Sequence, residues 1–363
     1  MRVLFVDDEP RVLEALERSL FQLDVEWEAS FANNGPAAIL ELERASYDVI
    51  VSDMRMPGMD GAELLAHARD NYPQTARIVL SGQTDEAAAV RAARVAHQFL
   101  IKPCDALTLR RVIERTLELS AGLNDDDLRA KVGKVERLPS TPRLFAELSQ
   151  LLDDETATVD AVVGVVRQDP AMSSKLLQVV NSSFFAASSS VTDVRTAVLR
   201  LGMKTIRNLA LGIGAFDAVG ELGSASLSVE KLQQRSLKIA RLASRIAAGR
   251  DDPDAAFMAG LTCDVGELLV TDPPVTEGVA SAERRITHAE VGAFLLGLWG
   301  LPFPIVQAVS NHHSPERNPY DRFALPQIVW LASSLVHGTR PDPEYLSRIG
   351  VSDLLVKFEG MLE

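Results

Sequence analysis

The chain has 363 residues, enough for two or three domains, and its 47% hydrophobic and 24% charged residues are ordinary for a globular protein. A formal net charge of −13 argues against nucleic-acid binding, which needs a basic surface. No apolar run approaches the ~18 residues of a membrane span, so we expect no membrane insertion. There is no signal-peptide pattern, and Cys104 and Cys263 are the only cysteines, so we expect a cytoplasmic protein without disulfides.

Residues 1–120 alternate apolar runs with amphipathic stretches. The amphipathic stretches have helical spacing, as in the segment that begins at Val12 and Leu13. Strands that alternate with helices form a parallel sheet covered on both faces, and ligands bind at the carboxyl ends of its strands. We therefore predict an α/β doubly wound domain whose five strands fall at 2–8, 27–32, 47–53, 76–82 and 97–103.

Polar side chains stand at the ends of four of these runs. Asp7 and Asp8 end the first, Asp53 the third, Ser81 the fourth and Lys102 the fifth. Converging carboxylates repel one another unless a cation intervenes, and Mg²⁺ prefers such hard oxygen ligands. A hydroxyl and an ammonium beside a bound Mg²⁺ would stabilise a phosphoryl group in transfer, with a carboxylate as the nucleophile. Solvated strand-end carboxylates are the plainer alternative.

The motifs "VDDEP", "DVIVSDMRMPGMDG", "LSG" and "IKP" occur in this order along residues 1–120. In their order and spacing they resemble the receiver domain of two-component response regulators. The resemblance implies a flavodoxin-like sheet with strand order 2-1-3-4-5. It also implies that Asp53 accepts phosphate from a cognate histidine kinase. A degenerate receiver that is never phosphorylated remains an alternative.

The same resemblance assigns roles to the residues around Asp53. Asp8 and Asp53 would ligate Mg²⁺, with help from Asp7 and the backbone carbonyl of Arg55. Ser81 and Lys102 would contact the phosphoryl group, and Ser81 would also act in the switch. Phe99 takes the position of the switch aromatic residue, and the Lys102–Pro103 peptide bond is expected to be cis.

Residues 121–135 are polar and charged, and they read either as a linker or as an extension of the preceding helix. From about residue 136 strand signals almost vanish, and helical periodicity continues to the C-terminus. Asp169 followed by Pro170 predicts an N-cap and a first helical position. We expect an all-α domain at 136–335 and a helical extension at 336–363.

The motifs "LPSTPRLFAELSQLL", "VVRQDPAMSSKLLQVVNSSFF", "AVLRLGMKTIRNL" and "HAEVGAFLLGLWGLP" followed by "VSNHH" resemble the HDOD output domain. HDOD domains are helical relatives of the HD phosphohydrolases that have generally lost the catalytic metal set. In that family they serve as regulatory or interaction modules. The resemblance therefore implies an HD-like helical domain and no metal in it.

Alignment by motif with an HD enzyme identifies a degenerate site. Arg235 stands in place of the first His, Cys263 in place of the second, and Ser333 in place of a closing Asp, while Asp264 is kept. Additional ligands of the two-metal enzymes correspond to His288, His312 and His313.

The chemistry of these positions argues against an HD-type metal centre. A guanidinium at Arg235 repels a dication and cannot be deprotonated, and Ser333 removes a charge. A thiolate can ligate zinc, so four ligands remain on count alone: Cys263, Asp264, His288 and His312. The alternative is that Arg235 or another hydrogen-bond donor holds Asp264.

Each histidine has a structural alternative to metal binding. His288 could help cap a helix or line the interface between the domains. His312 and His313 are adjacent and would point roughly 100° apart on a helix. We therefore expect one of them to be buried and the other to lie at the surface.

These observations predict a cytoplasmic, two-domain response regulator that is not an enzyme beyond its own phosphorylation and dephosphorylation. Phosphorylation of Asp53 would remodel one face of the receiver and bias dimerisation or receiver–output contacts. The expected partners are a histidine kinase, an unidentified downstream protein and a second copy of the chain. The alternative is a phosphorylation-gated, metal-dependent phosphohydrolase acting on a nucleotide or cyclic dinucleotide.

Overall fold

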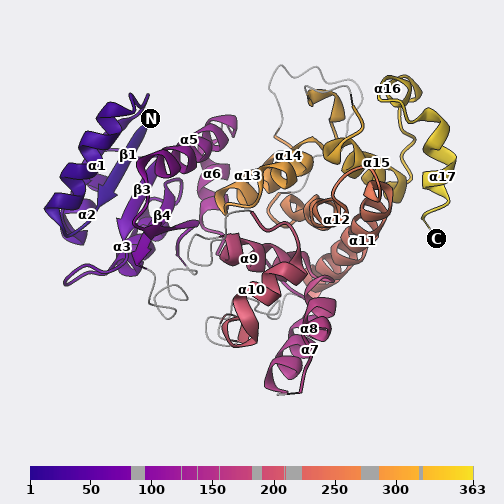
Figure 1. Ribbon diagram of the computed structural model, residues 1–363, viewed down its shortest axis with the longest axis horizontal. Coiled ribbons are helices and arrows are strands. Elements are labelled where there is room, and N and C mark those ends of the chain that lie inside the picture. The colour runs from indigo at the N-terminus through magenta and orange to yellow at the C-terminus, as the bar shows by residue number, and fades with distance from the viewer. Residues whose placement is uncertain are drawn as a thin grey trace. The chain divides into compact units, whose positions relative to one another are not determined.

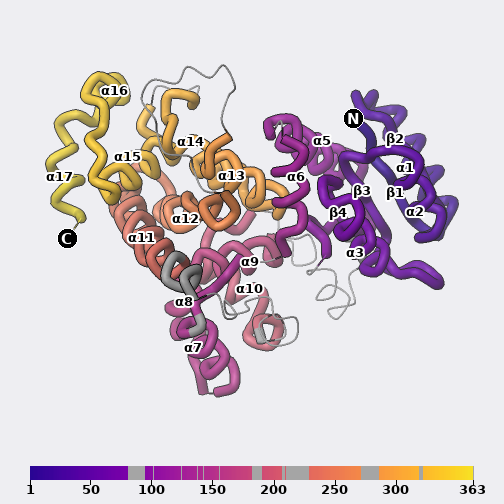
Figure 2. The backbone as a smooth tube through the Cα atoms, turned by 180° about the vertical axis from the view of Figure 1, so that it is seen from behind, coloured from indigo at the N-terminus to yellow at the C-terminus, as the bar shows by residue number. Residues whose placement is uncertain are grey.

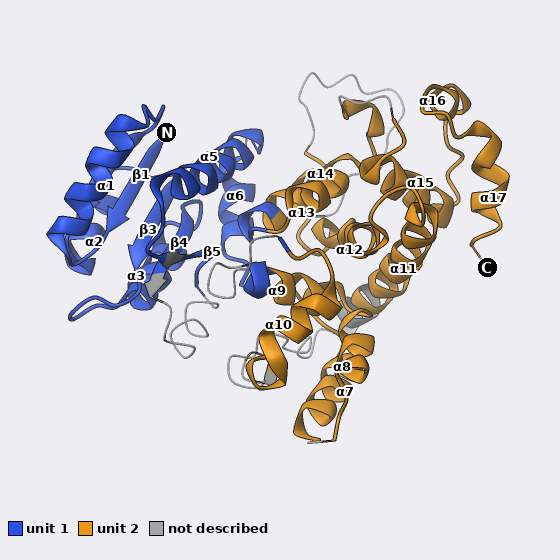
Figure 3. Ribbon diagram, viewed as in Figure 1, with its two compact units in different colours: residues 1–136, 178–190, 297–300 blue, residues 137–177, 191–296, 301–363 orange. Residues whose placement is uncertain are grey.

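The computed structural model describes residues 1–82, 95–123, 125–136, 138–154, 156–181, 190–207, 209, 223–270, 286–318 and 322–362. The chain divides into two compact units (Figure 3). The first, here called the receiver unit, holds residues 1–136, 178–190 and 297–300. The second, the helical unit, holds residues 137–177, 191–296 and 301–363. None of the described helices is long and apolar enough to cross a membrane.

The receiver unit is built on a five-stranded sheet in the order β2-β1-β3-β4-β5. Figure 1 labels three of these strands, β1, β3 and β4. All neighbouring strands are parallel, which confirms the predicted doubly wound fold and its strand order. The central strand β3 is buried along its whole length, because helices cover both faces of a parallel sheet. The strands are β1 (Arg2–Val6), β2 (Glu28–Ala32), β3 (Val49–Asp53), β4 (Ala76–Gly82) and β5 (Gln98–Lys102).

Most of the helices of the receiver unit begin at side chains that cap them. Asn34 and Asp105 each accept a hydrogen bond from a backbone N–H of the first turn, and Asp60 forms a capping box with Glu63. Helix α1 contacts α5, and α2 contacts α3. The helices are α1 (Pro10–Gln22), α2 (Gly35–Arg44), α3 (Gly61–Asn71), α5 (Ala106–Gly122) and α6 (Asp126–Gly133).

The segment at 121–135 holds a separate short helix. Helix α5 ends at Gly122, and α6 begins after Asp125, whose side chain accepts from the Leu128 N–H. The last residue of α6, Gly133, lies so close to Pro73 that a Cβ there would meet the Pro73 carbonyl oxygen at 1.8 Å. Arg77 Nη2 donates to the Gly133 carbonyl at 2.7 Å, so the end of α6 is anchored beside the start of β4.

The helical unit is built around a buried central helix. Every residue of α12 from Ala255 to Thr262 is buried, and α11 contacts both α12 and α15 (Figure 2). The α11–α12 approach requires a glycine, because a Cβ at Gly260 would lie 2.9 Å from Ala240 Cα. This close packing sets the register between α11 and the end of α12.

The predicted helix start at Asp169 is confirmed. Asp169 Oδ1 accepts from the Ala171 and Met172 N–H groups, at 2.8 and 3.1 Å, and Pro170 is the first residue of α9. Ser140 and Gln233 donate to the other oxygen of Asp169. Burial raises the pKa of this fully buried carboxyl, although these hydrogen bonds oppose the rise.

The remaining helices of this part of the chain follow the predicted periodicity. The loop expected at 271–278 lies outside the described residues, and so do residues 186–189 of the loop expected at 186–190. The helices are α7 (Pro142–Asp153), α8 (Val159–Val166), α9 (Pro170–Asn181), α10 (Val194–Arg207), α11 (Gly223–Ala247), α12 (Pro253–Thr262), η3 (Val265–Leu268), α13 (His288–Leu298), α14 (Phe303–Asn311), η4 (Pro315–Arg317), α15 (Leu325–His337), α16 (Pro343–Arg348), η5 (Ser352–Leu354) and α17 (Leu355–Glu359).

Candidate functional sites of the two units

The carboxylate site of the receiver unit lies at the carboxyl ends of β1, β3 and β5. Lys102 Nζ donates to Asp7 Oδ2 at 2.5 Å and forms an ion pair with Asp53 Oδ1. The Arg55 N–H donates to Asp53 Oδ2 at 2.7 Å, and the Glu9 N–H donates to Asp7 Oδ1 at 3.0 Å. The ends of the parallel strands thus bring together three side chains that are up to 95 residues apart in the chain.

Burial dominates the electrostatics of this site. Asp53 is only 6% exposed, and burial raises the pKa of its carboxyl even though Lys102 and the Arg55 N–H oppose the rise. The negative charge of Asp7 adds to it. Burial would lower the pKa of Lys102, but hydrogen bonds to Asp53 and Asp7 outweigh it, so the pKa of the ammonium is raised. The site therefore has an excess of negative charge that one ammonium balances only in part.

The other predicted residues of this site are placed as follows. Asp8 follows Asp7 and is half-buried, and Phe99 is buried within β5. The Lys102–Pro103 bond is cis, as predicted. The side chain of Ser81 lies outside the described part of the structure. Two buried carboxylates with a third beside them supply hard oxygen donors, so the residues present fit Mg²⁺.

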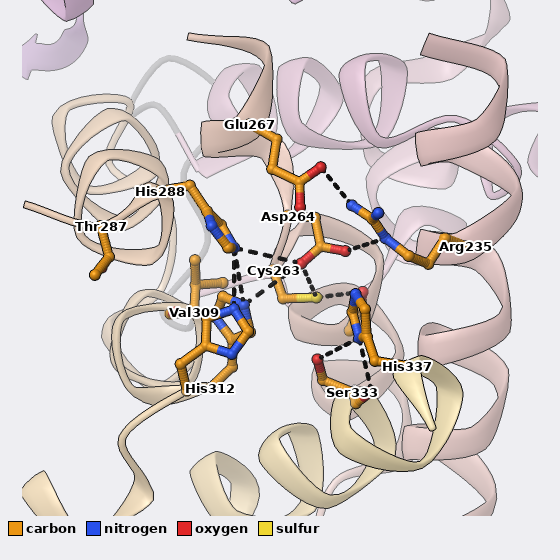
Figure 4. A network of polar contacts seen from close by, with 12 residues as sticks. Arg235, Cys263, Asp264, Glu267, Thr287, His288, Val309, His312, Ser333 and His337 are labelled. Atoms are coloured by element: carbon orange, nitrogen blue, oxygen red, sulfur yellow. Dashed lines mark hydrogen bonds and ion pairs between the residues drawn. The ribbon is translucent and has the colours of Figure 1, made fainter. Parts of the chain in front are cut away.

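The degenerate HD positions form the candidate site of the helical unit (Figure 4). Arg235 of α11 lies beside the segment that follows α12. Its Nε donates to Asp264 Oδ2 at 2.8 Å, and its Nη2 donates to Glu267 Oε2 at 2.6 Å. This contact confirms the prediction that Arg235 holds Asp264. Asp264 is fully buried, whereas the Arg235 side chain is 30% exposed.

His288 and His312 lie on the other side of Asp264 from Arg235 (Figure 4), and His313 contacts His288. His288 Nε2 lies 3.3 Å from His312 Nε2 and 3.2 Å from His313 Nε2. Asp264 Oδ1 lies 3.4 Å from His312 Nε2 and 3.7 Å from His288 Nε2. His312 Nδ1 donates to the Val309 carbonyl at 2.6 Å, which fixes the orientation of that ring.

Two of the structural alternatives for the histidines need correction. His288 is the first residue of α13 but does not cap it, because Thr287 and Glu290 exchange the capping hydrogen bonds. His312 is buried and His313 exposed, as expected. Both nevertheless turn toward His288. Adjacent residues on a regular helix could not do this, but α14 ends at Asn311 and both histidines lie in the turn that follows it.

Cys263 and Ser333 are both buried within this unit. The Cys263 thiol donates to the Gly260 carbonyl at 3.2 Å and lies 3.5 Å from Asp264 Oδ1. The Ser333 hydroxyl lies 3.3 Å from His337 Nδ1, one helical turn along α15. Ser333 thus contacts a residue of its own helix.

Burial and neighbouring charges shift the pKa values of three groups in this site. Burial would raise the pKa of Asp264, but His288, His312 and Arg235 outweigh it, and the pKa of this carboxyl is well below its usual range. His313 is exposed as a residue, but its ring nitrogen in contact with His288 is partly buried, and this desolvation and then the neighbouring imidazoles lower the pKa of His313 to about 3, so its ring is neutral at physiological pH. Burial and the Asp264 charge raise the pKa of the Cys263 thiol, which stays protonated.

One member of the network was not among the predicted site residues. Glu267 binds the second arm of the Arg235 guanidinium. It follows Asp264 by three residues, a spacing that places side chains on the same side of a helical turn. That spacing was the available sequence signal.

Family models match both parts of the chain. A model of the response regulator receiver domain matches residues 3–114, and a model of the HDOD domain matches residues 138–315. An uncharacterized protein of Treponema pallidum is 24% identical over 254 residues, which are 64% of this chain and 48% of that protein. The hydrogenase transcriptional regulatory protein HoxA of Cupriavidus necator is 35% identical over 152 residues, 41% of this chain and 30% of that protein.

Solved structures are similar as well. The MmoQ response regulator of Methylococcus capsulatus is 24% identical, with a TM-score of 0.48, over 61% of this chain and 98% of that one. The receiver domain of an HD domain-containing protein of Pseudomonas fluorescens is 29% identical, with a TM-score of 0.32, over 33% of this chain and 96% of that one. The chain spans less than half the length of the two curated relatives above. It combines a response regulator receiver domain with an HDOD domain, the organisation of a two-component response regulator.

Proposed function

We propose that this protein is a phosphorylation-dependent response regulator that accepts phosphate on Asp53 from a histidine kinase and signals through a non-catalytic HDOD domain. The observation that carries the proposal is the position of Lys102 between Asp7 and Asp53 at the carboxyl edge of the sheet. An ammonium at this position can stabilise the oxygens of a phosphoryl group on Asp53.

Asp7, Asp8, Asp53 and the Arg55 carbonyl would hold Mg²⁺. The ion would neutralise charge on the transferred group. Asp53 Oδ1 would be the attacking atom, and its pairing with Lys102 would orient it. Ser81 and Phe99 would then report phosphorylation to the rest of the receiver domain, which would bias self-association or the partner surface of the HDOD domain.

The HDOD domain would act by protein–protein interaction. Its Asp264, which an HD enzyme would use as a metal ligand, has one oxygen committed to Arg235. The competing function, a metal-dependent phosphohydrolase, is favoured by the convergence of His288, His312 and His313. The guanidinium of Arg235 favours the regulatory role, because it stands at the position of the first ligand of an HD centre and cannot itself ligate a metal.

Beryllofluoride with Mg²⁺ tests the proposal, because it mimics a phosphorylated aspartate. We expect it to change the oligomeric state, or hydrogen exchange in the HDOD domain, of the full chain. The Asp53→Asn variant, treated in the same way, should not respond. A wild-type response confined to the carboxylate site would contradict the switch.

A further inference from the structure

The imidazole cluster of the HDOD domain cannot satisfy its own hydrogen bonds in the neutral state. The Val309 carbonyl can only accept, so His312 carries its proton on Nδ1 and presents a lone pair at Nε2. His288 Nε2 faces both this atom and His313 Nε2. A single ring hydrogen on His288 can serve only one of these contacts. His312 Nε2 also lies 3.4 Å from Asp264 Oδ1, so in the neutral state two acceptor atoms face each other there unless a cation or a proton lies between them.

The separations match the ligand edges of a small metal ion. Zinc bound to imidazole nitrogens at about 2.0–2.1 Å in a tetrahedron has ligand–ligand separations of about 3.3–3.4 Å. The two His288 contacts are 3.3 and 3.2 Å, and His312 Nε2 lies 3.4 Å from Asp264 Oδ1. The three rings form a cluster in which the three ligand nitrogens, one from each ring, all lie within 4.8 Å of one another.

The surroundings also have the features of a metal site. The hydrogen bond from His312 Nδ1 to a backbone carbonyl is the outer contact that fixes the tautomer of a metal-bound histidine. Asp264 and Glu267 carry two negative charges, and Arg235 carries one positive charge, so a dication would not leave the cluster strongly charged. The Cys263 thiol donates to the Gly260 carbonyl, and its sulfur lies 3.5 Å from Asp264 Oδ1, beside the same cluster.

We propose that the HDOD domain binds one divalent transition metal of the zinc class through Nε2 of His288, His312 and His313, with Asp264 Oδ1 beside them. Arg235 is a positioning residue in this site, because it holds the other oxygen of Asp264. The arrangement differs from an HD centre, whose first ligand position is occupied here by that guanidinium. It replaces our expectation from sequence that the helical domain holds no metal, and it is independent of phosphorylation at Asp53.

Cobalt titration of the full chain tests this site. The protein is stripped with a chelator, and excess Mg²⁺ is kept present to occupy the receiver carboxylates. Co²⁺ is then added while visible absorption and calorimetric stoichiometry are followed. We expect one equivalent of Co²⁺ with a ligand-field spectrum in the wild type and in Asp53→Asn. The spectrum should be absent in His313→Gln, whose exposed position makes the substitution the least disruptive of the three.

Two further variants complete the test. Arg235→Gln should keep the spectrum but bind about 10–100-fold more weakly, as expected for loss of an outer-shell partner. His67→Gln, which changes a half-buried histidine of α3, should bind as the wild type does. Should His313→Gln lose its helical circular dichroism, His288→Gln takes its place. The proposal would be overturned if the wild type bound no Co²⁺, or if its spectrum equalled those of the cluster variants. In that case a protonated imidazole would pair with Asp264 instead of a metal.

Discussion

Arg235 Nε donates to Asp264 Oδ2 at 2.8 Å, so a partly exposed guanidinium holds one oxygen of a fully buried carboxylate. The pair joins α11 to the segment after α12, and Glu267 takes a second arm of the same guanidinium. Removal of either partner leaves the other without its counter-charge, which is the costly way to break a buried ion pair.

Arg235→Met tests the stabilising part of this pair. We expect the metal-free protein to lose about 2–4 kcal/mol, near the lower end of the range for breaking a buried pair because Arg235 is partly exposed. Arg241→Met, an exposed position two turns along α11, should change stability by less than about 0.5 kcal/mol. Urea unfolding followed by circular dichroism measures both. Similar losses in the two variants would mean that the pair has no special role.

Asp264→Asn should alter the acid limb of stability. The pKa of Asp264 is well below its usual range in the folded protein, so its contribution to stability is present above the unfolded value of 3.8. That contribution is lost as the pH falls from 3.8 through the folded pKa. The wild type should therefore lose more stability than Asp264→Asn as the pH falls from about 5 to about 2. Chelator-treated protein, unfolded with urea at several pH values, provides the comparison, and parallel acid limbs would contradict the assignment.

Gly266→Ala should displace the start of α13. A Cβ at Gly266 would lie 1.9 Å from the His288 carbonyl oxygen, so the two segments would have to separate. Overpacking of this kind costs about 1–3 kcal/mol, and it should also weaken Co²⁺ binding, because His288 would move. Gly122→Ala at the end of α5 is the matched control, since a Cβ there meets nothing within 4 Å. Calorimetric melting temperatures distinguish the two, and an unchanged Gly266→Ala protein would refute the packing argument.

Asp53→Asn should abolish phosphorylation without unfolding the receiver domain. Burial raises the pKa of Asp53, which means that its charge is costly in the fold, so a neutral amide is tolerated. We expect no phosphorylated species by intact mass after incubation with acetyl phosphate and Mg²⁺. Asp127→Asn, at an exposed position in α6, should be labelled as the wild type is. Labelling that persists in Asp53→Asn would place the acceptor elsewhere.

The sequence pattern predicted the receiver fold almost completely. Apolar runs that alternate with helical periods permit few arrangements, and the position of Asp7, Asp53 and Lys102 at strand ends follows from the parallel direction of the strands. The helical domain was less predictable, because amphipathic periodicity defines helices but not the side on which each one packs. The capping pair of Thr287 and Glu290 was also missed, although it frees His288 to line the site.

Sequence alone therefore determined the two domains, the carboxylate site of the first and the loss of the HD ligand pattern in the second. It also indicated Arg235 as the partner of Asp264, because a fixed positive charge and a buried carboxylate in one site attract each other. Only the tertiary structure decided that His288, His312 and His313 converge, since their approach depends on where α14 ends and how closely Gly266 packs against α13. Contacts made across separate helices depend on such close packing, which local sequence periodicity does not encode.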